Sequence, residues 1–226
     1  QTFLLESLCE SLRDIALFAL HTGLRDQELT HLSWADELPS QQGCLIFRLP
    51  AEYAKNGRSR LVVCNSVATQ VVEARRGDTK VYIFEHHEGK ARRRISSGMG
   101  WKAGKGRAVK LLEGTTGRTA TGGFKSLHFH DLRHTFGSRL LAAEVSYDVR
   151  RQLLGHKDGD ITAHYCKVPT EQLIDAVKRL EPPKLPQKPR NGNVLAFPSN
   201  SEGRNVLKNK GEVVATGGLE PPTPAL

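Results

Sequence analysis

Histidine and arginine gather in LHFHDLRHTFGSRLLAAEVSYDVRRQLLGH, residues 127–156, among residues that favour helix. His130 and Arg133 stand three positions apart, and His130 and His134 stand four apart. On a helix both pairs share one face. Two histidines at that spacing suit a metal ion, whereas arginine beside histidine suits a phosphate, because a guanidinium can bond two phosphate oxygens at once.

Four further residues are of types and in places that suit a phosphate site. Arg25 lies in TGLRDQEL at an expected helix start, where free backbone N–H groups favour anions. Lys55 precedes an Asn-Gly pair, which predicts a tight hairpin turn from which a long side chain can reach into a groove. His156 follows a glycine that should end a helix, and Tyr165 lies nine positions later.

Together these side chains could break a phosphodiester bond without a metal. The tyrosine would attack phosphorus, the arginines would stabilise the charge on five-coordinate phosphorus, and a cation would protonate the leaving oxygen. The net charge of +9 also favours a polyanionic partner.

Five stretches of the chain resemble the successive motifs of the tyrosine recombinases, the phage integrase family, in that family's order. They are ALHTGLRDQELTHLSW, YAKNGRSR, HFHDLRHTFGSRLLAA, VRRQLLGH and ITAHYCKV. One such motif alone is weak, but five in register are specific. The resemblance covers roughly residues 1–180 and implies the catalytic domain of a recombinase.

By that resemblance, three residues would hold the scissile phosphate of DNA. Arg25 and Arg133 would be the two catalytic arginines, and His156 would donate a hydrogen bond to a phosphate oxygen. Glu28 would brace the first motif instead of reacting.

The other implied roles concern bonds and protons. Tyr165 would be the nucleophile, leaving a 3′-phosphotyrosyl link and a free 5′-hydroxyl. Lys55 would be the general acid for the 5′-oxygen, and His130 would assist proton transfer at the tyrosine. Since the link conserves bond energy, neither ATP nor a metal nor another cofactor is implied.

The resemblance also implies partners and a setting. Double-stranded DNA attachment sites would be bound by a tetramer of the chain, helped by accessory DNA-bending or directionality proteins. The protein would integrate or excise a phage or other mobile element in the bacterial cytoplasm, at the nucleoid. No apolar run is long enough to predict a membrane span, and no membrane partner is expected.

Two other interpretations remain open. HDLRH, residues 130–134, matches a His-acidic-x-x-His zinc pattern, but Asp131 stands where a metalloprotease has glutamate, and no clear third ligand follows. That interpretation would leave Arg25, Lys55 and Tyr165 without a role. The alternative of a DNA-binding module without catalysis conflicts with the presence of every expected catalytic residue.

The hydrophobic pattern predicts an α+β domain, mainly helical, with a small antiparallel sheet that carries Lys55. Helices are expected over residues 3–20, from the break at Gly23 onward, and over 66–76, 130–143, 147–154, 160–166 and 170–180. Strands are expected over 44–50 and 80–86 and in a hairpin over 52–63. Residues 86–126 show no clear pattern.

Two units are expected: a catalytic domain over residues 1–181 and a disordered, Pro/Gly-rich C-terminal tail over 182–226. The chain opens on Gln1 close to a helix, so we expect a domain upstream in the parent protein. Helix 170–180 has an apolar stripe that could pack on its own core or dock on a neighbouring protomer, as such helices often do in the family.

The coding sequence of the tail has a further implication. Residues 218–221, Gly-Leu-Glu-Pro, can be encoded as GGN-CTC-GAA-CCN, which contains the reverse complement of GGTTCGA, the T-arm sequence of tRNA genes. The tail also resembles those of integrases whose genes run into a tRNA-derived attachment site.

We therefore predict that Leu219 and Glu220 are encoded by CTC and GAA or a near variant, at the 3′ end of a tRNA gene. Deleting residues 212–226 should leave folding and strand cleavage intact, because the tail would reflect DNA position alone. Gene sequencing and an assay of the truncated chain check this. Unrelated codons, or loss of folding on truncation, would contradict it.

Overall fold

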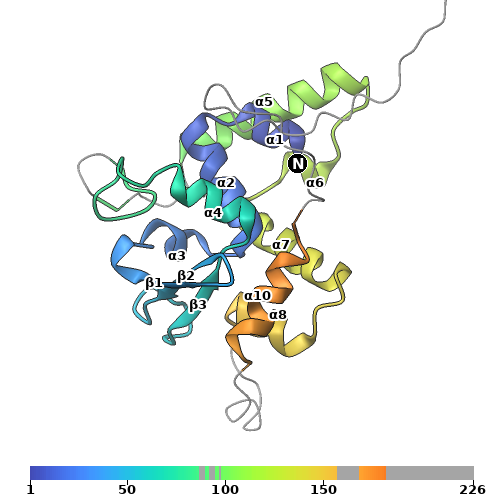
Figure 1. The fold of residues 1–226 in the computed structure, drawn as a ribbon. Helices are drawn as coiled ribbons and strands as arrows, with labels where there is room; N and C mark the ends of the chain where they lie inside the picture. Colours follow the sequence, from blue (N-terminus) through green and yellow to red (C-terminus); the bar gives the residue numbers. More distant parts are fainter. Residues whose placement is uncertain (87–89, 92–94, 97, 157–167, 182–226) are drawn as a thin grey trace, which may run out of the picture. The chain divides into compact units, whose positions relative to one another are not determined.

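The computed structural model describes residues 1–86, 90–91, 95–96, 98–156 and 168–181. In chain order its elements are α1 (Thr2–Ser7), α2 (Glu10–Thr22), α3 (Asp26–Thr30), η1 (Trp34–Asp36), β1 (Glu37–Gln41), β2 (Cys44–Leu49), β3 (Arg60–Val63), α4 (Ser66–Glu73), α5 (Met99–Thr116), α6 (Gly122–Lys125), α7 (Asp131–Ala142), α8 (Tyr147–Leu154) and α10 (Thr170–Lys178). Figure 1 confirms the expected mainly helical α+β class. The expected helix 160–166 and the tail 182–226 lie outside the described residues.

The sheet has three antiparallel strands in the order β1-β2-β3. The predicted β2 and β3 are present, with Phe47 opposite Val62 and Leu49 opposite Arg60. The edge strand β1 was not predicted, because ELPSQ contains a proline and no alternating apolar pattern. Helices α8 and α10 contact β3, and α4 contacts β2.

The connection between β2 and β3 differs from the tight turn predicted. Residues 50–59 form a loop, in which the Asn-Gly pair makes only a local turn with Gly57 at φ +66°. The N–H of Gly57 bonds the carbonyl of Ala54 at 2.9 Å. Lys55 is therefore exposed on the loop that connects the antiparallel strands β2 and β3, and the expected strand and tight turn beside it are wrong.

The strand predicted over residues 80–86 does not form. The Glu85 carboxylate accepts the backbone N–H groups of Lys80 and Val81, both at 3.2 Å, and folds the segment back on itself. Ile83 is buried, and its N–H donates a hydrogen bond to the carbonyl of Leu32, just after α3. The apolar residues that suggested a strand are therefore buried in a folded-back loop.

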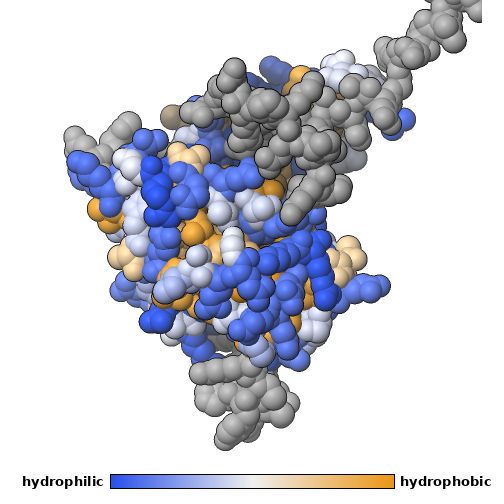
Figure 2. Space-filling view, in the orientation of Figure 1, coloured by the Kyte–Doolittle hydropathy of each residue, from blue (hydrophilic) through white to orange (hydrophobic). Residues whose placement is uncertain are grey.

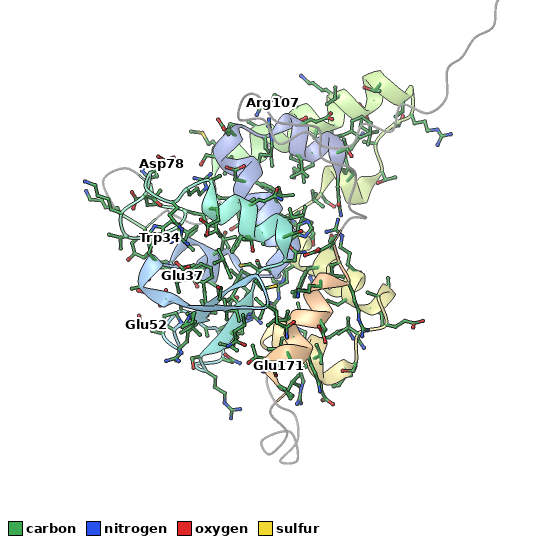
Figure 3. The ribbon with its side chains drawn as sticks, in the orientation of Figure 1. Trp34, Glu37, Glu52, Asp78, Arg107 and Glu171 are labelled. Carbon is green, nitrogen blue, oxygen red and sulfur yellow. The ribbon has the colours of Figure 1, made fainter. Side chains whose placement is uncertain are left out.

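The single helix predicted over residues 3–20 is broken into α1 and α2 by two extended residues. A break leaves helix-end carbonyls without helical partners. Arg13 donates to the carbonyl of Leu5 at 3.0 Å, and Arg107 of α5, labelled in Figure 3, donates to that of Ser7 at 2.7 and 3.0 Å. Arginine side chains therefore stabilise the break.

Helix α5 lies in the region 86–126, for which no element was predicted. Glycine occupies four of its 18 positions and lowers its intrinsic helix propensity. A Cβ at Gly104 would lie 2.5 Å from Leu8 Cδ2, and one at Gly100 would lie 2.8 Å from Leu12 Cδ1. These two glycines let α5 approach the N-terminal helices closely, which outweighs the propensity cost.

Helix α10 packs on the core of its own chain. Leu173, Ile174 and Val177 are fully buried in an apolar cluster with residues of β2, β3, α7 and α8. Docking of this helix on a neighbour would require it to leave that cluster.

Hydrophilic residues predominate on the face drawn in Figure 2. In the described part of the chain, no helix is both long and apolar enough to span a membrane.

The contact between α5 and the N-terminal helices can be tested with two glycines of the same helix. Gly106→Ala should raise the free energy of unfolding by up to about 1 kcal/mol, because alanine favours helix and the added Cβ meets open space. Gly104→Ala should lower it, since Leu8 must move. Urea denaturation measures both, and equal stabilisation would argue against the close approach.

Candidate active site

Arg25 is positioned by a sharp turn between two helices. Gly23 ends α2 in the left-handed conformation, at φ +65°. A Cβ at Gly23 would lie 2.4 Å from Phe136 Cδ1 of α7, so both the backbone and the packing favour glycine. Arg25 then forms the N-cap of α3, and its side chain keeps 21% of its surface exposed. It can therefore meet a ligand.

Glu28 is the acidic centre of the site, with a side chain that is 1% exposed. Its Oε1 accepts from Arg25 Nη1 at 2.7 Å, and its Oε2 accepts from the Arg25 backbone N–H at 2.9 Å and from Arg60 Nη2 at 2.8 Å. Burial alone would raise the pKa of Glu28, but the charge of Arg60 and the bonds from Arg25 outweigh it and lower the pKa. The carboxylate is therefore ionised at neutral pH.

Arg60 belongs to the same cluster, although it was not among the residues predicted for the site. It begins β3, its side chain is 7% exposed, and its Nη1 donates to the carbonyl of Leu153 at 2.9 Å. The contact joins positions 93 residues apart, which no local spacing reveals. Two signals were available: Arg60 ends YAKNGRSR, one of the five stretches that resemble the family, and it is a charged residue at the start of an otherwise apolar strand.

Arg133 lies buried in α7, with 4% exposed. Its Nη1 donates to the carbonyl of Gly23 at 2.7 Å, and its Nη2 donates to that of Leu154. Both carbonyls stand at C-terminal helix ends, which lack helical partners and carry partial negative charge. Burial, with the charges of Arg25 and Arg60, lowers the pKa of Arg133 to about 9, so it stays protonated at neutral pH.

The two predicted histidines are exposed residues beside these arginines. His130 is the N-cap of α7, and His156 follows the left-handed Gly155 that ends α8. Partial burial lowers the pKa of both rings, and the charges of Arg133 and Arg25 lower it further. At neutral pH each ring is mainly neutral, with one nitrogen that donates and one that accepts.

The structure thus brings together four of the six predicted site residues. They are Arg25, His130, Arg133 and His156. Lys55 lies on the loop 50–59 and makes no hydrogen bond or ion pair with other described residues. Tyr165 lies outside the described residues.

The cluster contains more positive than negative charge. Among the described residues, the guanidiniums of Arg25, Arg60 and Arg133 lie around the carboxylate of Glu28. Like charges held together in a partly buried place favour the binding of an anion. A phosphate group would offset the surplus.

The metal alternative finds less support. The rings of His130 and His134 make an edge contact, with centroids 4.9 Å apart. Asp131 accepts the backbone N–H of His128 at 2.7 Å and so helps to start α7. Within the described ranges, no group of three metal-binding side chains is close enough to hold an ion.

Replacing Glu28 should show how strongly it holds the cluster together. We expect Glu28→Gln to lower the free energy of unfolding at neutral pH by about 3 kcal/mol, because Arg25 and Arg60 would lose their buried anion. The folded carboxyl has a lowered pKa, so its contribution is present above the ordinary value of 4.5 and is lost as pH falls through the folded pKa. The two proteins should therefore converge in stability in acid.

Denaturant titrations at neutral and acid pH measure this effect. Glu73→Gln is the matched control, since Glu73 pairs with Arg76 at the exposed surface and should change stability little. An equal loss in both variants, or a Glu28 effect that does not depend on pH, would refute the assignment.

Comparison with known proteins identifies the family of the chain. The phage integrase family matches residues 4–172. The integrase of Salmonella phage P22 is 24% identical over 180 residues, covering 79% of this chain and 44% of that protein. The tyrosine recombinase XerC of Xanthomonas campestris pv. campestris is 33% identical over 175 residues, covering 76% of this chain and 49% of that protein.

Among solved structures, a Tn1549 transposon integrase in complex with circular intermediate DNA gives a TM-score of 0.49 and 19% identity, covering 71% of this chain and 55% of that one. The chain spans about half the length of the curated relatives it matches. Because the family match extends over most of the sequence, the chain belongs to the phage integrase family.

Proposed function

We propose that residues 1–181 form the catalytic domain of a site-specific DNA recombinase that cleaves and rejoins strands through a 3′-phosphotyrosyl intermediate. The observation that carries the proposal is the arginine cluster around Glu28, whose surplus positive charge lies beside two neutral histidines. A phosphodiester of duplex DNA is the anion that fits both this charge and the family.

In this proposal the arginines stabilise the transition state. Arg25 and Arg133 donate to the non-bridging oxygens of the phosphate, where negative charge accumulates as the tyrosine attacks. Arg133 bonds two helix-end carbonyls, which leaves other N–H donors of its fork for the phosphate. The neutral ring of His156 donates one further hydrogen bond to a phosphate oxygen.

Bond exchange follows from the remaining groups. The Tyr165 oxygen forms a bond to phosphorus as the bond from phosphorus to the 5′-oxygen breaks. The accepting nitrogen of His130 takes the tyrosine proton, and the Lys55 ammonium gives a proton to the leaving 5′-oxygen. The 5′-hydroxyl of a partner strand then attacks the phosphotyrosyl link and releases Tyr165.

The proposal includes partners and a setting. The chain acts as a tetramer across two double-stranded attachment sites, with accessory DNA-bending or directionality proteins, and uses no cofactor or metal. It integrates or excises a mobile element in the bacterial cytoplasm, at the nucleoid. Its net charge of +9 supports a DNA partner, since cationic contacts to phosphates release bound counterions. Residues 182–226 are proposed to be a separate tail.

Covalent capture of DNA tests the proposal. The 226-residue chain is incubated with sheared, nicked genomic DNA from its source, denatured, and recovered with whatever DNA remains attached. Wild-type protein should retain DNA, and Tyr165→Phe should retain none while binding DNA as before, because the change removes only the attacking oxygen. An adduct that persists in Tyr165→Phe would place the nucleophile elsewhere.

Two further versions of the capture experiment distinguish the proposal from a metal site and from a non-catalytic DNA-binding module. The adduct should form equally in EDTA and in His134→Ala, since cations hold the phosphate in place of a metal. Loss in EDTA that zinc restores would establish the metal interpretation. DNA binding with no adduct in the wild-type protein would indicate a non-catalytic module.

A further inference from the structure

Arg60 reaches two elements that carry proposed catalytic groups. Its Nη2 donates to Glu28 Oε2 in α3 at 2.8 Å, and its Nη1 donates to the carbonyl of Leu153 in α8 at 2.9 Å. Helix α3 begins just after Arg25, which the same Glu28 binds. Helix α8 ends just before His156. The Arg60 guanidinium therefore connects the helix that follows Arg25 with the helix that precedes His156.

Packing reinforces this connection. A Cβ at Gly155 would lie 2.6 Å from both Cδ and Nε of Arg60, so the arginine side chain lies directly against the backbone that leads into His156. Gly155 has φ +59°, a conformation that favours glycine in any case. A side chain at position 155 would therefore displace Arg60.

A half-buried ion pair elsewhere in the chain provides a comparison for Arg60. Arg75 bonds Asp14 at 2.7 Å, its side chain is 17% exposed, and its Nε is buried without a partner among the described residues, as is that of Arg60. Arg75 links α2 to the chain after α4 and touches none of the site residues described above. It is therefore a matched control.

We propose that Arg60 is a positioning residue of the active site, which orients Arg25 through Glu28 and fixes His156 through the end of α8. The inference rests on the proposed recombinase function. Arg60 acts through other residues and does not itself touch the phosphate. Lysine could not replace it, because an ammonium lacks the planar fork that bonds two acceptors on opposite sides.

The test compares Arg60→Met, Arg60→Lys and Arg75→Met in the full chain. Single-turnover cleavage is measured on a nicked duplex captured by the wild-type protein, together with DNA affinity and thermal unfolding. Both Arg60 variants should cleave on the order of 10²-fold more slowly at unchanged DNA affinity, since small displacements of catalytic groups cost about that much. Arg75→Met should cleave at the wild-type rate even where its stability falls.

Two results would overturn the inference: cleavage by Arg60→Lys at the wild-type rate, or equal slowing in Arg75→Met. If Arg60→Met does not fold, Arg60→Lys decides the question, because it keeps the charge and most of the side-chain stem.

A second readout needs no cleavage. NMR titration of His156 without DNA should show its pKa rising in Arg60→Met, since the Arg60 charge contributes to lowering it, and staying unchanged in Arg75→Met. An unchanged His156 titration in Arg60→Met would also overturn the inference. Failure of the wild-type chain to form any DNA adduct would refute the proposed function, while this titration still tests Arg60.

Discussion

The buried carboxylate of Glu28 is the interaction on which the site depends. It lets Arg25 and Arg60 approach each other. Arg133 lies close enough that both of their charges lower its pKa. Burying an ion pair costs desolvation energy, which offsets much of the attraction between the charges, yet removing one partner alone would leave the other charges buried without compensation. The effect of the Glu28 carboxylate is geometric, because it joins α3 to the first residue of β3, and through Arg60 to the end of α8.

Helix ends are the second structural theme of the site. Arg133 bonds the terminal carbonyls of α2 and α8, and Arg60 bonds another at the end of α8. Each of these helices ends at a left-handed glycine, Gly23 or Gly155, immediately before the segment that carries a predicted site residue. The cations thus anchor the helix ends and also supply the surplus charge that a phosphate would neutralise.

The sequence predicted the parts of the site that depend on local spacing. His130 and Arg133 lie at the start of α7, and the glycine stops lie where expected, because helix periodicity and caps are local properties. Arg60 was missed because its partners are distant in the chain. The loop that carries Lys55 is longer than the Asn-Gly turn predicted. Helix α5 was not predicted, because glycines that allow close packing lower its helix propensity.

The central claim is that the surplus charge of the arginine cluster serves to hold a phosphate of DNA. Cleavage by Arg25→Ala of a duplex whose scissile phosphate is replaced by an uncharged methylphosphonate tests it most directly. The variant should fail on ordinary DNA and recover on the neutral substrate, because no oxygen charge then needs Arg25. Failure on both substrates, with wild-type protein active on ordinary DNA, would contradict a role in offsetting phosphate charge.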